Sequence, residues 1–196
     1  MSKYYAVKKG YTTGIFKSWE ECEKQVKGFS GAIFKSFKTE EEALLYMDDV
    51  KKEVPNFGLI AYVDGSFNVK TKEYGYGCVI IEGQKVIAKI SNKDNDDELA
   101  SMRNVAGEIQ GCMKAIEYAI SREEKAICIY YDYEGIEKWA NKEWKANKKG
   151  TIEYAKKIEE YRSKIDVHFI KVLAHSGDFY NEMADKLAKK AVGING

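Results

Sequence analysis

Proline, histidine and cysteine are scarce in this chain of 196 residues, and it has no long apolar segment. No apolar run approaches the roughly 20 residues that a membrane-spanning helix needs. The first residues lack the apolar core of a secretory signal, so we expect a cytoplasmic protein that does not contact membranes. The cysteines are far apart and flanked by apolar residues, which excludes a paired metal site and a secreted disulfide framework and predicts reduced, buried thiols. These cysteines are Cys22, Cys78, Cys112 and Cys128.

A strong charge imbalance is also absent, because the net charge is only +1. This average hides a segregation of charge along the chain. Residues 1–38 hold eight Lys against three Glu, and residues 136–164 hold nine Lys or Arg against five Glu. Residues 39–54 reverse the balance, with six acids against two Lys. Two basic segments in a nearly neutral chain can bind a polyanion such as a nucleic acid.

The single proline, Pro55, marks the expected boundary between two domains, because proline rarely continues a helix. Before it, short alternating segments predict strands near residues 3–8, 15–16 and 29–37. Capping boxes starting at Ser18 and Thr39 predict two helices, ending near Lys27 and Met47. We therefore expect a small ββαβα domain over residues 1–53, a short linker over 54–57 and a second domain over 58–196.

The second domain is predicted to be of the α/β class, with a five-stranded mixed sheet flanked by helices. Strands are expected at residues 58–67, 74–82, 85–91, 126–131 and 167–172. Helices are expected at about 104–121, 134–147 and 151–163, followed by a last helix through Ala184 and Ala188.

Acidic residues follow or flank these elements in a way that could bring them together. Asp64 and Asp132 each end a buried apolar strand, and parallel neighbours place such ends side by side. Glu108 lies one turn into a helix, after Gly107, which allows close approach to the sheet. Asp185 follows the small residue Ala184 in the last helix. Taken singly, each could equally be a solvated acid or part of an Asp-Gly turn, and spacing alone does not decide.

Four motifs in the second domain make a more specific pattern. They are Tyr62-Val63-Asp64-Gly65-Ser66, Asn104-x-x-x-Glu108, Tyr130-Tyr131-Asp132 and His175-Ser176-Gly177-x-x-x-Asn181-Glu182-x-Ala184-Asp185. In order and spacing, these motifs resemble the catalytic domain of type 1 ribonuclease H over residues 58–192. The resemblance implies that Asp64, Glu108, Asp132 and Asp185 bind two Mg²⁺ ions, with Mn²⁺ as an alternative.

The implied activity is hydrolysis of the RNA strand of an RNA–DNA hybrid, leaving 5′-phosphate and 3′-hydroxyl ends. Carboxylate oxygens suit Mg²⁺, and two ions about 4 Å apart can activate water and stabilise the leaving oxygen. The resemblance also implies that His175 and Glu182 assist proton movement and product departure. It assigns substrate contacts to Ser66, Arg103, Asn104, Trp139, Trp144 and Asn181.

Two residues depart from the pattern common in that family. Arg103 and Val105 stand where Thr and Asn are common, and Arg103 could bind a phosphate with two hydrogen bonds. The other histidine, His168, lies inside a strand pattern and is expected to be structural. Trp139 could equally be a core residue of an amphipathic helix.

Residues 3–47 resemble the hybrid-binding domain that precedes some type 1 ribonucleases H. The matching segments are Tyr5-Ala6-Val7-x-x-Gly10, Thr13-Gly14-Ile15-Phe16, Ser18-Trp19-x-x-Cys22, Val26-Lys27-Gly28 and Phe34-Lys35-Ser36-Phe37. The resemblance implies that Tyr5, Trp19 and Phe34 stack on deoxyribose and that Lys35 binds phosphate, whereas Ser36 replaces a second Lys. Alternatively, Trp19 and Phe34 are ordinary core residues of a small domain.

Three functions follow as alternatives. The first is a monomeric, metal-dependent endoribonuclease acting on hybrids. The second is a protein that binds hybrids or double-stranded RNA with weak or no cleavage, against which the presence of all four acids argues. The third is a nuclease with the same sheet acting on DNA, which the first domain does not favour.

Overall fold

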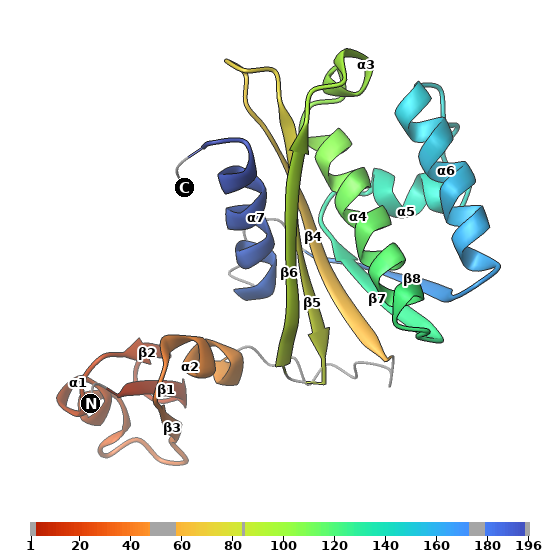
Figure 1. Cartoon of the computed structure of the whole chain (residues 1–196). Coiled ribbons are helices and arrows are strands. Elements are labelled where there is room, and N and C mark those ends of the chain that lie inside the picture. The colour runs from red at the N-terminus through yellow and green to blue at the C-terminus, as the bar shows by residue number, and fades with distance from the viewer. Residues whose placement is uncertain (1–2, 48–57, 84, 173–178, 195–196) are drawn as a thin grey trace. The chain divides into compact units, whose positions relative to one another are not determined.

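The computed structural model describes residues 3–47, 58–83, 85–172 and 179–194 (Figure 1). The chain divides into two compact units, residues 1–55 and 56–196. The linker predicted at 54–57 lies outside the described residues. Among the helices of the described part, none is both long and apolar enough to cross a membrane.

The first unit is a three-stranded antiparallel sheet, ordered β2-β1-β3, with two short helices. Its elements are β1 (Tyr4–Lys9), β2 (Gly14–Phe16), α1 (Trp19–Val26), β3 (Ile33–Phe37) and α2 (Glu40–Met47). Both predicted capping interactions form, because the hydroxyls of Ser18 and Thr39 each accept a backbone N–H bond of 3.2 Å three residues on. Val7, Cys22 and Val26 form its small core between β1 and α1.

The second unit is built on a five-stranded sheet ordered β6-β5-β4-β7-β8. β4, β5 and β6 pair in antiparallel fashion, whereas β7 and β8 run parallel to β4. The strands are β4 (Leu59–Phe67), β5 (Tyr74–Glu82), β6 (Lys85–Asp94), β7 (Ala126–Tyr131) and β8 (Asp166–Lys171). The helices are α3 (Asp97–Ala100), α4 (Asn104–Ser121), α5 (Gly135–Ala140), α6 (Lys149–Arg162) and α7 (Phe179–Ala191).

Helices cover both faces of this sheet, with α7 on one side and α4, α5 and α6 on the other (Figure 1). The larger part of the core lies between the sheet and α4, where apolar side chains of β4, β5 and β7 meet Ile109, Cys112 and Ile116. All four cysteines are buried free thiols, as predicted.

One predicted helix is shorter than expected. The pattern at 134–147 predicts a single helix, but α5 ends at Ala140 and residues 141–147 form a turn. Lys142 adopts a positive φ of 59°, and the backbone N–H groups of Glu143 and Trp144 both donate to the carbonyl of Lys138. Helical periodicity does not reveal such a local reversal. The short helix α3 was not predicted either.

Candidate active site and nucleic-acid surface

Asp64 lies in β4 just beyond the last residue that pairs with the parallel strand β7. The parallel register pairs Tyr62 with Tyr130, and it ends there, while β4 continues to Phe67 alongside β5. The same register places Asp64 level with Asp132, which directly follows β7. Side chains two residues apart share a face of a strand. The two carboxylates therefore follow the stacked rings of Tyr62 and Tyr130, whose centroids are 4.5 Å apart.

α7 brings Asp185 to the same face of the sheet. Asp64 pairs across the sheet with Gly77, and a Cβ on Gly77 would collide with the carbonyl oxygen of Ala184. The helix turn that carries Asp185 therefore packs directly on the backbone opposite Asp64. The Tyr180 ring, 5.3 Å from Tyr62, extends this contact along α7.

Glu108 approaches from the other side of the sheet, on α4. A Cβ on Gly65 would collide with the Asn104 carbonyl and lie 2.5 Å from the Glu108 nitrogen, so only glycine lets α4 sit this close. The Glu108 side chain is 1% exposed and accepts a 3.2 Å hydrogen bond from the Tyr133 backbone N–H. It therefore reaches the chain immediately after Asp132.

The electrostatics confirm that these acids act on one another. Burial, then the negative charges of Asp132 and Asp185, raise the pKa of Asp64 to about 7, against the lowering effect of the Gly65 N–H bond and Lys189. Burial, followed by Asp132 and Asp64, raises the pKa of Glu108 well above its usual range. Mutual repulsion of this kind is what a bound cation relieves.

Lys189 is the cation already present beside this cluster. Its ammonium lies 2.7 Å from Asp185 Oδ2, one helical turn away. Sequence reasoning missed Lys189, although its i, i+4 spacing from Asp185 on a helix could have identified it. Among the described residues, no three or more His, Cys, Asp or Glu side chains are arranged closely enough to coordinate a metal ion.

The donor set nevertheless fits a divalent metal. It consists entirely of carboxylate oxygens, which suit Mg²⁺. One of these acids, Glu108, is almost fully buried with an elevated pKa, a placement that costs free energy unless the charge is compensated. Asp64, Glu108, Asp132 and Asp185 are the residues that would bind the ion.

Three of the predicted substrate residues lie next to this cluster. Ser66 is buried on β4, two residues after Asp64, whereas Asn104 and Arg103 are exposed at the start of α4. Arg103 has φ 54° and ψ −131°, a conformation that L-residues rarely adopt. Such strain persists where the surrounding structure requires it and is frequent at functional sites.

Trp139, near the end of α5, contacts Trp144, which lies in the turn after this helix. Their ring centroids are 6.0 Å apart at an edge-to-face angle of 73°, and Trp144 is 41% exposed. Trp139 packs partly against the core and Tyr133, as its alternative role as a core residue predicts, while its contact with substrate stays a prediction. Arg162 fixes the turn by donating to the Ala140 carbonyl and to Asn141 Oδ1, at 2.9 and 2.7 Å.

The remaining predicted catalytic residues are His175 and Glu182, and the remaining predicted substrate residue is Asn181. Glu182 is exposed and Asn181 is buried, both in the first turns of α7. His175 lies outside the described residues. His168 is exposed on β8.

In the first unit, three predicted aromatic residues, Tyr5, Trp19 and Phe34, form one cluster, called here the aromatic surface, of which Tyr5 is partly buried. The Trp19 ring lies 5.6 Å from that of Tyr5 and 5.8 Å from that of Phe34, measured between centroids. Trp19 and Phe34 are 44% and 41% exposed, so they are not ordinary core residues. Exposed aromatic rings in a lysine-rich segment such as residues 1–38 are typical of surfaces on which nucleic acids stack.

Lys35 does not join the aromatic surface. Neighbouring residues of a strand point to opposite faces, and Phe34 belongs to the Trp19 face. The Lys35 ammonium instead lies 5.6 Å from the Phe37 ring and 5.9 Å from the Tyr46 ring, measured to the centroids. Ser36, exposed on β3, pairs with Tyr5 and is the residue on the aromatic face.

Comparisons with known proteins agree with this geometry. Residues 3–47 match the family model described as the Ribonuclease H1 N-terminal domain, and residues 56–193 match the RNase H model. A ribonuclease H of Crithidia fasciculata is 50% identical over 44 residues, which cover 22% of this chain and 9% of that protein. The chain thus spans only a small part of these eukaryotic relatives. The matched segments cover 9%, 18% and 16% of the ribonucleases H of Crithidia fasciculata, Saccharomyces cerevisiae and Mus musculus.

Similarity across the second unit is weaker in sequence and broader in extent. The ribonuclease H of Wolbachia pipientis wMel is 28% identical over 152 residues, covering 72% of this chain and 97% of that protein. The crystal structure of LC11-RNase H1 in complex with an RNA/DNA hybrid superposes with a TM-score of 0.55 at 16% identity. It covers 69% of this chain and 99% of that one.

Sheet order, helix placement and converging carboxylates define the second unit as a ribonuclease H-fold domain with an acidic site. The chain belongs to the ribonuclease H family, and its first unit matches the N-terminal domain of ribonuclease H1.

Proposed function

We propose that this protein is an endoribonuclease that hydrolyses the RNA strand of RNA–DNA hybrids. The observation that carries the proposal is the convergence of Asp64, Glu108, Asp132 and Asp185 from two strands and two helices of a ribonuclease H fold. The family uses divalent metal ions, and the all-oxygen donor set favours Mg²⁺, with Mn²⁺ as the alternative.

The metal, when bound by these carboxylates, supplies an activated water and charge stabilisation for the leaving 3′-oxygen, which leaves 5′-phosphate and 3′-hydroxyl ends. The chain's own residues supply the placement. The sheet register holds Asp64 and Asp132 level, and the Gly65 and Gly77 contacts bring in Glu108 and Asp185. His175 and Glu182 are proposed to move protons as the product departs.

Substrate selection is proposed to involve both units. Ser66, Arg103, Asn104 and Asn181 adjoin the acidic site, where contacts to a 2′-hydroxyl would distinguish RNA from DNA. The Trp139–Trp144 pair is proposed to contact the DNA strand. In the first unit, the aromatic surface is proposed to stack on the hybrid, and tethering the two units raises the effective substrate concentration.

The most direct experiment uses end-labelled duplexes of one sequence, prepared as an RNA–DNA hybrid, as double-stranded RNA and as double-stranded DNA, with Mg²⁺ or with a chelator. The proposal predicts cleavage of the RNA strand of the hybrid alone, and only with Mg²⁺. Ligation of the products without prior kinase or phosphatase treatment tests the predicted ends.

Two outcomes contradict the proposal and identify the alternatives. Binding of hybrid or double-stranded RNA without cleavage indicates a binding protein. Cleavage of duplex DNA indicates a DNA nuclease on the same sheet.

A further inference from the structure

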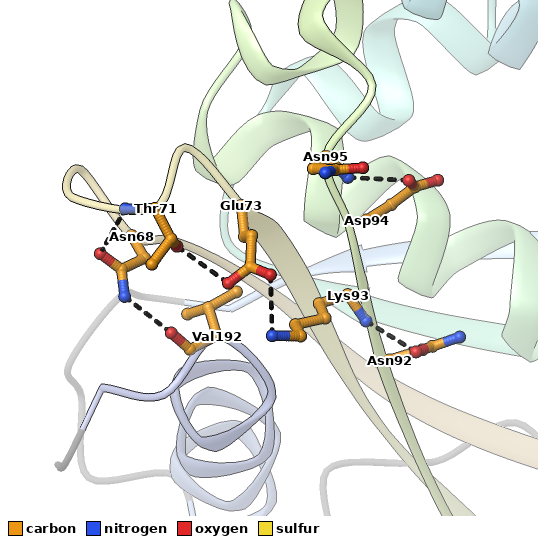
Figure 2. Close-up of polar contacts among 8 residues, drawn as sticks. All are labelled: Asn68, Thr71, Glu73, Asn92, Lys93, Asp94, Asn95 and Val192. Carbon is orange, nitrogen blue, oxygen red and sulfur yellow. Dashed lines mark hydrogen bonds and ion pairs between the residues drawn. The ribbon is translucent and has the colours of Figure 1, made fainter.

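A polar cluster at the far end of α7 is not used by the proposed reaction. It joins the β4–β5 turn to the last residues of the helix, as Figure 2 shows. Asn68 is its centre. The Asn68 Nδ2 donates to the carbonyl oxygen of Val192 at 2.8 Å, across 124 positions of sequence.

The way in which α7 ends provides the acceptor for this bond. Gly193, with φ 72°, lets the chain reverse, and the N–H groups of Gly193 and Ile194 donate to the carbonyls of Lys190 and Lys189 at 3.1 and 2.9 Å. This pairing is the Schellman motif. It leaves the Val192 carbonyl without a partner in the helix, and Asn68 provides one.

The turn that presents Asn68 is itself braced. The Asn68 Oδ1 accepts from the backbone N–H of Lys70 at 2.9 Å and from that of Thr71 at 3.3 Å. Figure 2 shows the second of these bonds and the Thr71 hydroxyl, which donates to Glu73 at 2.8 Å. Glu73 in turn pairs with Lys93 of β6 at 2.8 Å. The Asn68 amide therefore occupies a fixed position relative to the sheet.

Beyond the contact of Tyr180 with Tyr62, α7 meets the sheet at two glycines of β5. A Cβ on Gly75 would lie 2.7 Å from Val192 Cγ1, and Gly77 accommodates the backbone of Ala184. Glycines let the helix approach closely but offer no side chains that interlock against sliding along the axis. Asn68 supplies a directional bond that fixes the axial position.

We infer that Asn68 is a positioning residue for Asp185, acting through α7. Val192 lies seven residues, about 10 Å along the axis, beyond Asp185, and a helix is stiff over that length. Anchoring Val192 fixes the height at which Asp185 faces Asp64 and Asp132. The inference rests on the proposed function only in treating these carboxylates as the metal site.

The test compares Asn68→Asp with Thr71→Ala. Aspartate keeps the oxygen that accepts from Lys70 but loses the Nδ2 donor, whereas Thr71→Ala alters the same turn without touching α7. Mg²⁺ alone, without substrate, is titrated against the melting temperature, and amide exchange is measured over residues 189–194. Asn68→Ser, which is too short to reach Val192, replaces Asn68→Asp if that variant fails to fold.

The half-saturating Mg²⁺ concentration should rise about tenfold for Asn68→Asp. Changes of this size are typical when a residue that positions a metal ligand is replaced. Exchange at 189–194 should accelerate, and cleavage at saturating Mg²⁺ should stay within about threefold of the parent. Thr71→Ala should leave the Mg²⁺ midpoint within about twofold.

Either of two results overturns the inference. One is an unchanged Mg²⁺ midpoint in Asn68→Asp despite faster exchange, which makes the bond merely structural. The other is an equal shift in both variants. Absence of hybrid cleavage by the parent protein would instead contradict the proposed function, while the substrate-free Mg²⁺ titration would still decide the role of Asn68.

Discussion

The two functional surfaces of this protein are built in opposite ways. The aromatic surface exposes Trp19 and Phe34 to solvent, and Tyr5 packs beneath them on a core of only a few residues. The acidic site places Glu108 at 1% exposure and forces its neighbours to repel one another. Substitutions in the aromatic surface can change the affinity for nucleic acid with little loss of stability. The acidic site, by contrast, lowers the stability of the fold because it holds like charges close together.

The largest expected effect breaks the acidic site alone. Asp132→Asn keeps the shape of the side chain but removes the negative charge that acts on both Asp64 and Glu108. Hybrid cleavage should fall by about a thousandfold or more, as when a group essential to charge stabilisation is lost. Hybrid affinity in chelator should stay within about threefold, measured by filter binding, and a fully active variant would contradict the assignment.

The second effect concerns stability without metal. The pKa of Asp64 is raised to about 7, so the folded state holds this proton more tightly than the unfolded chain does. The folded state therefore loses stability as pH rises from about 4 to about 7. Asp64→Asn removes that loss and should raise the free energy of unfolding in chelator at pH 8 by about 2–4 kcal/mol.

Denaturant melts at pH 4 and pH 8 check this prediction. The difference between Asp64→Asn and the parent should be large at pH 8, small at pH 4, and reduced by Mg²⁺ at pH 8. A variant less stable than the parent at pH 8 in chelator would contradict the repulsion argument.

The third effect breaks the aromatic surface alone. Trp19→Ala removes the ring that contacts both Tyr5 and Phe34, and should weaken hybrid binding by about 1–3 kcal/mol, the value of one stacked base. The Mg²⁺-dependent thermal shift should not change. Tyr11→Ala is the matched control, because Tyr11 is 63% exposed in the same unit but contacts Phe29 instead. Equal losses in both variants would argue against a specific role for Trp19.

The smallest effect sharpens the comparison by adding a charge. Ser36 lies on the aromatic face, whereas Lys35 points to the opposite face, over Phe37 and Tyr46. Ser36→Lys should tighten hybrid binding several-fold at low salt and steepen the salt dependence by about one phosphate contact.

Ser121→Lys, at the exposed end of α4, carries the same added charge on the second unit. Binding titrations at several salt concentrations should separate the two variants. If both tighten binding equally, net charge rather than placement explains the gain.

The sequence predicts the structure best where apolar residues repeat with the period of a strand or a helix. Strand patterns predicted that Asp64 and Asp132 end neighbouring strands. Asp132 does follow β7, but β4 continues past Asp64 to Phe67, and extending the parallel register by two residues places the two acids level. The partners Glu108 and Asp185 came from family resemblance, because a helical acid has no local pattern that separates it from solvated surface.

Other features depend on contacts that a sequence pattern does not encode. The positive φ of Lys142 ends α5 early, and the bond from Asn68 to Val192 spans nearly the whole second unit. The face of Lys35 follows from strand alternation, but the motif match groups it with Phe34 because it treats adjacent positions as neighbours in space.

The glycines that seat α4 and α7 have a consequence for how this sequence can change. At Gly65 and Gly77, the backbone of a helix meets the backbone of a strand, so any side chain added at either position would push α4 or α7 away from the sheet. Apolar substitutions elsewhere in the core should therefore change the spacing of the four acids less than a substitution at either glycine. The core of this protein can drift over many generations of substitution, provided that these two glycines do not.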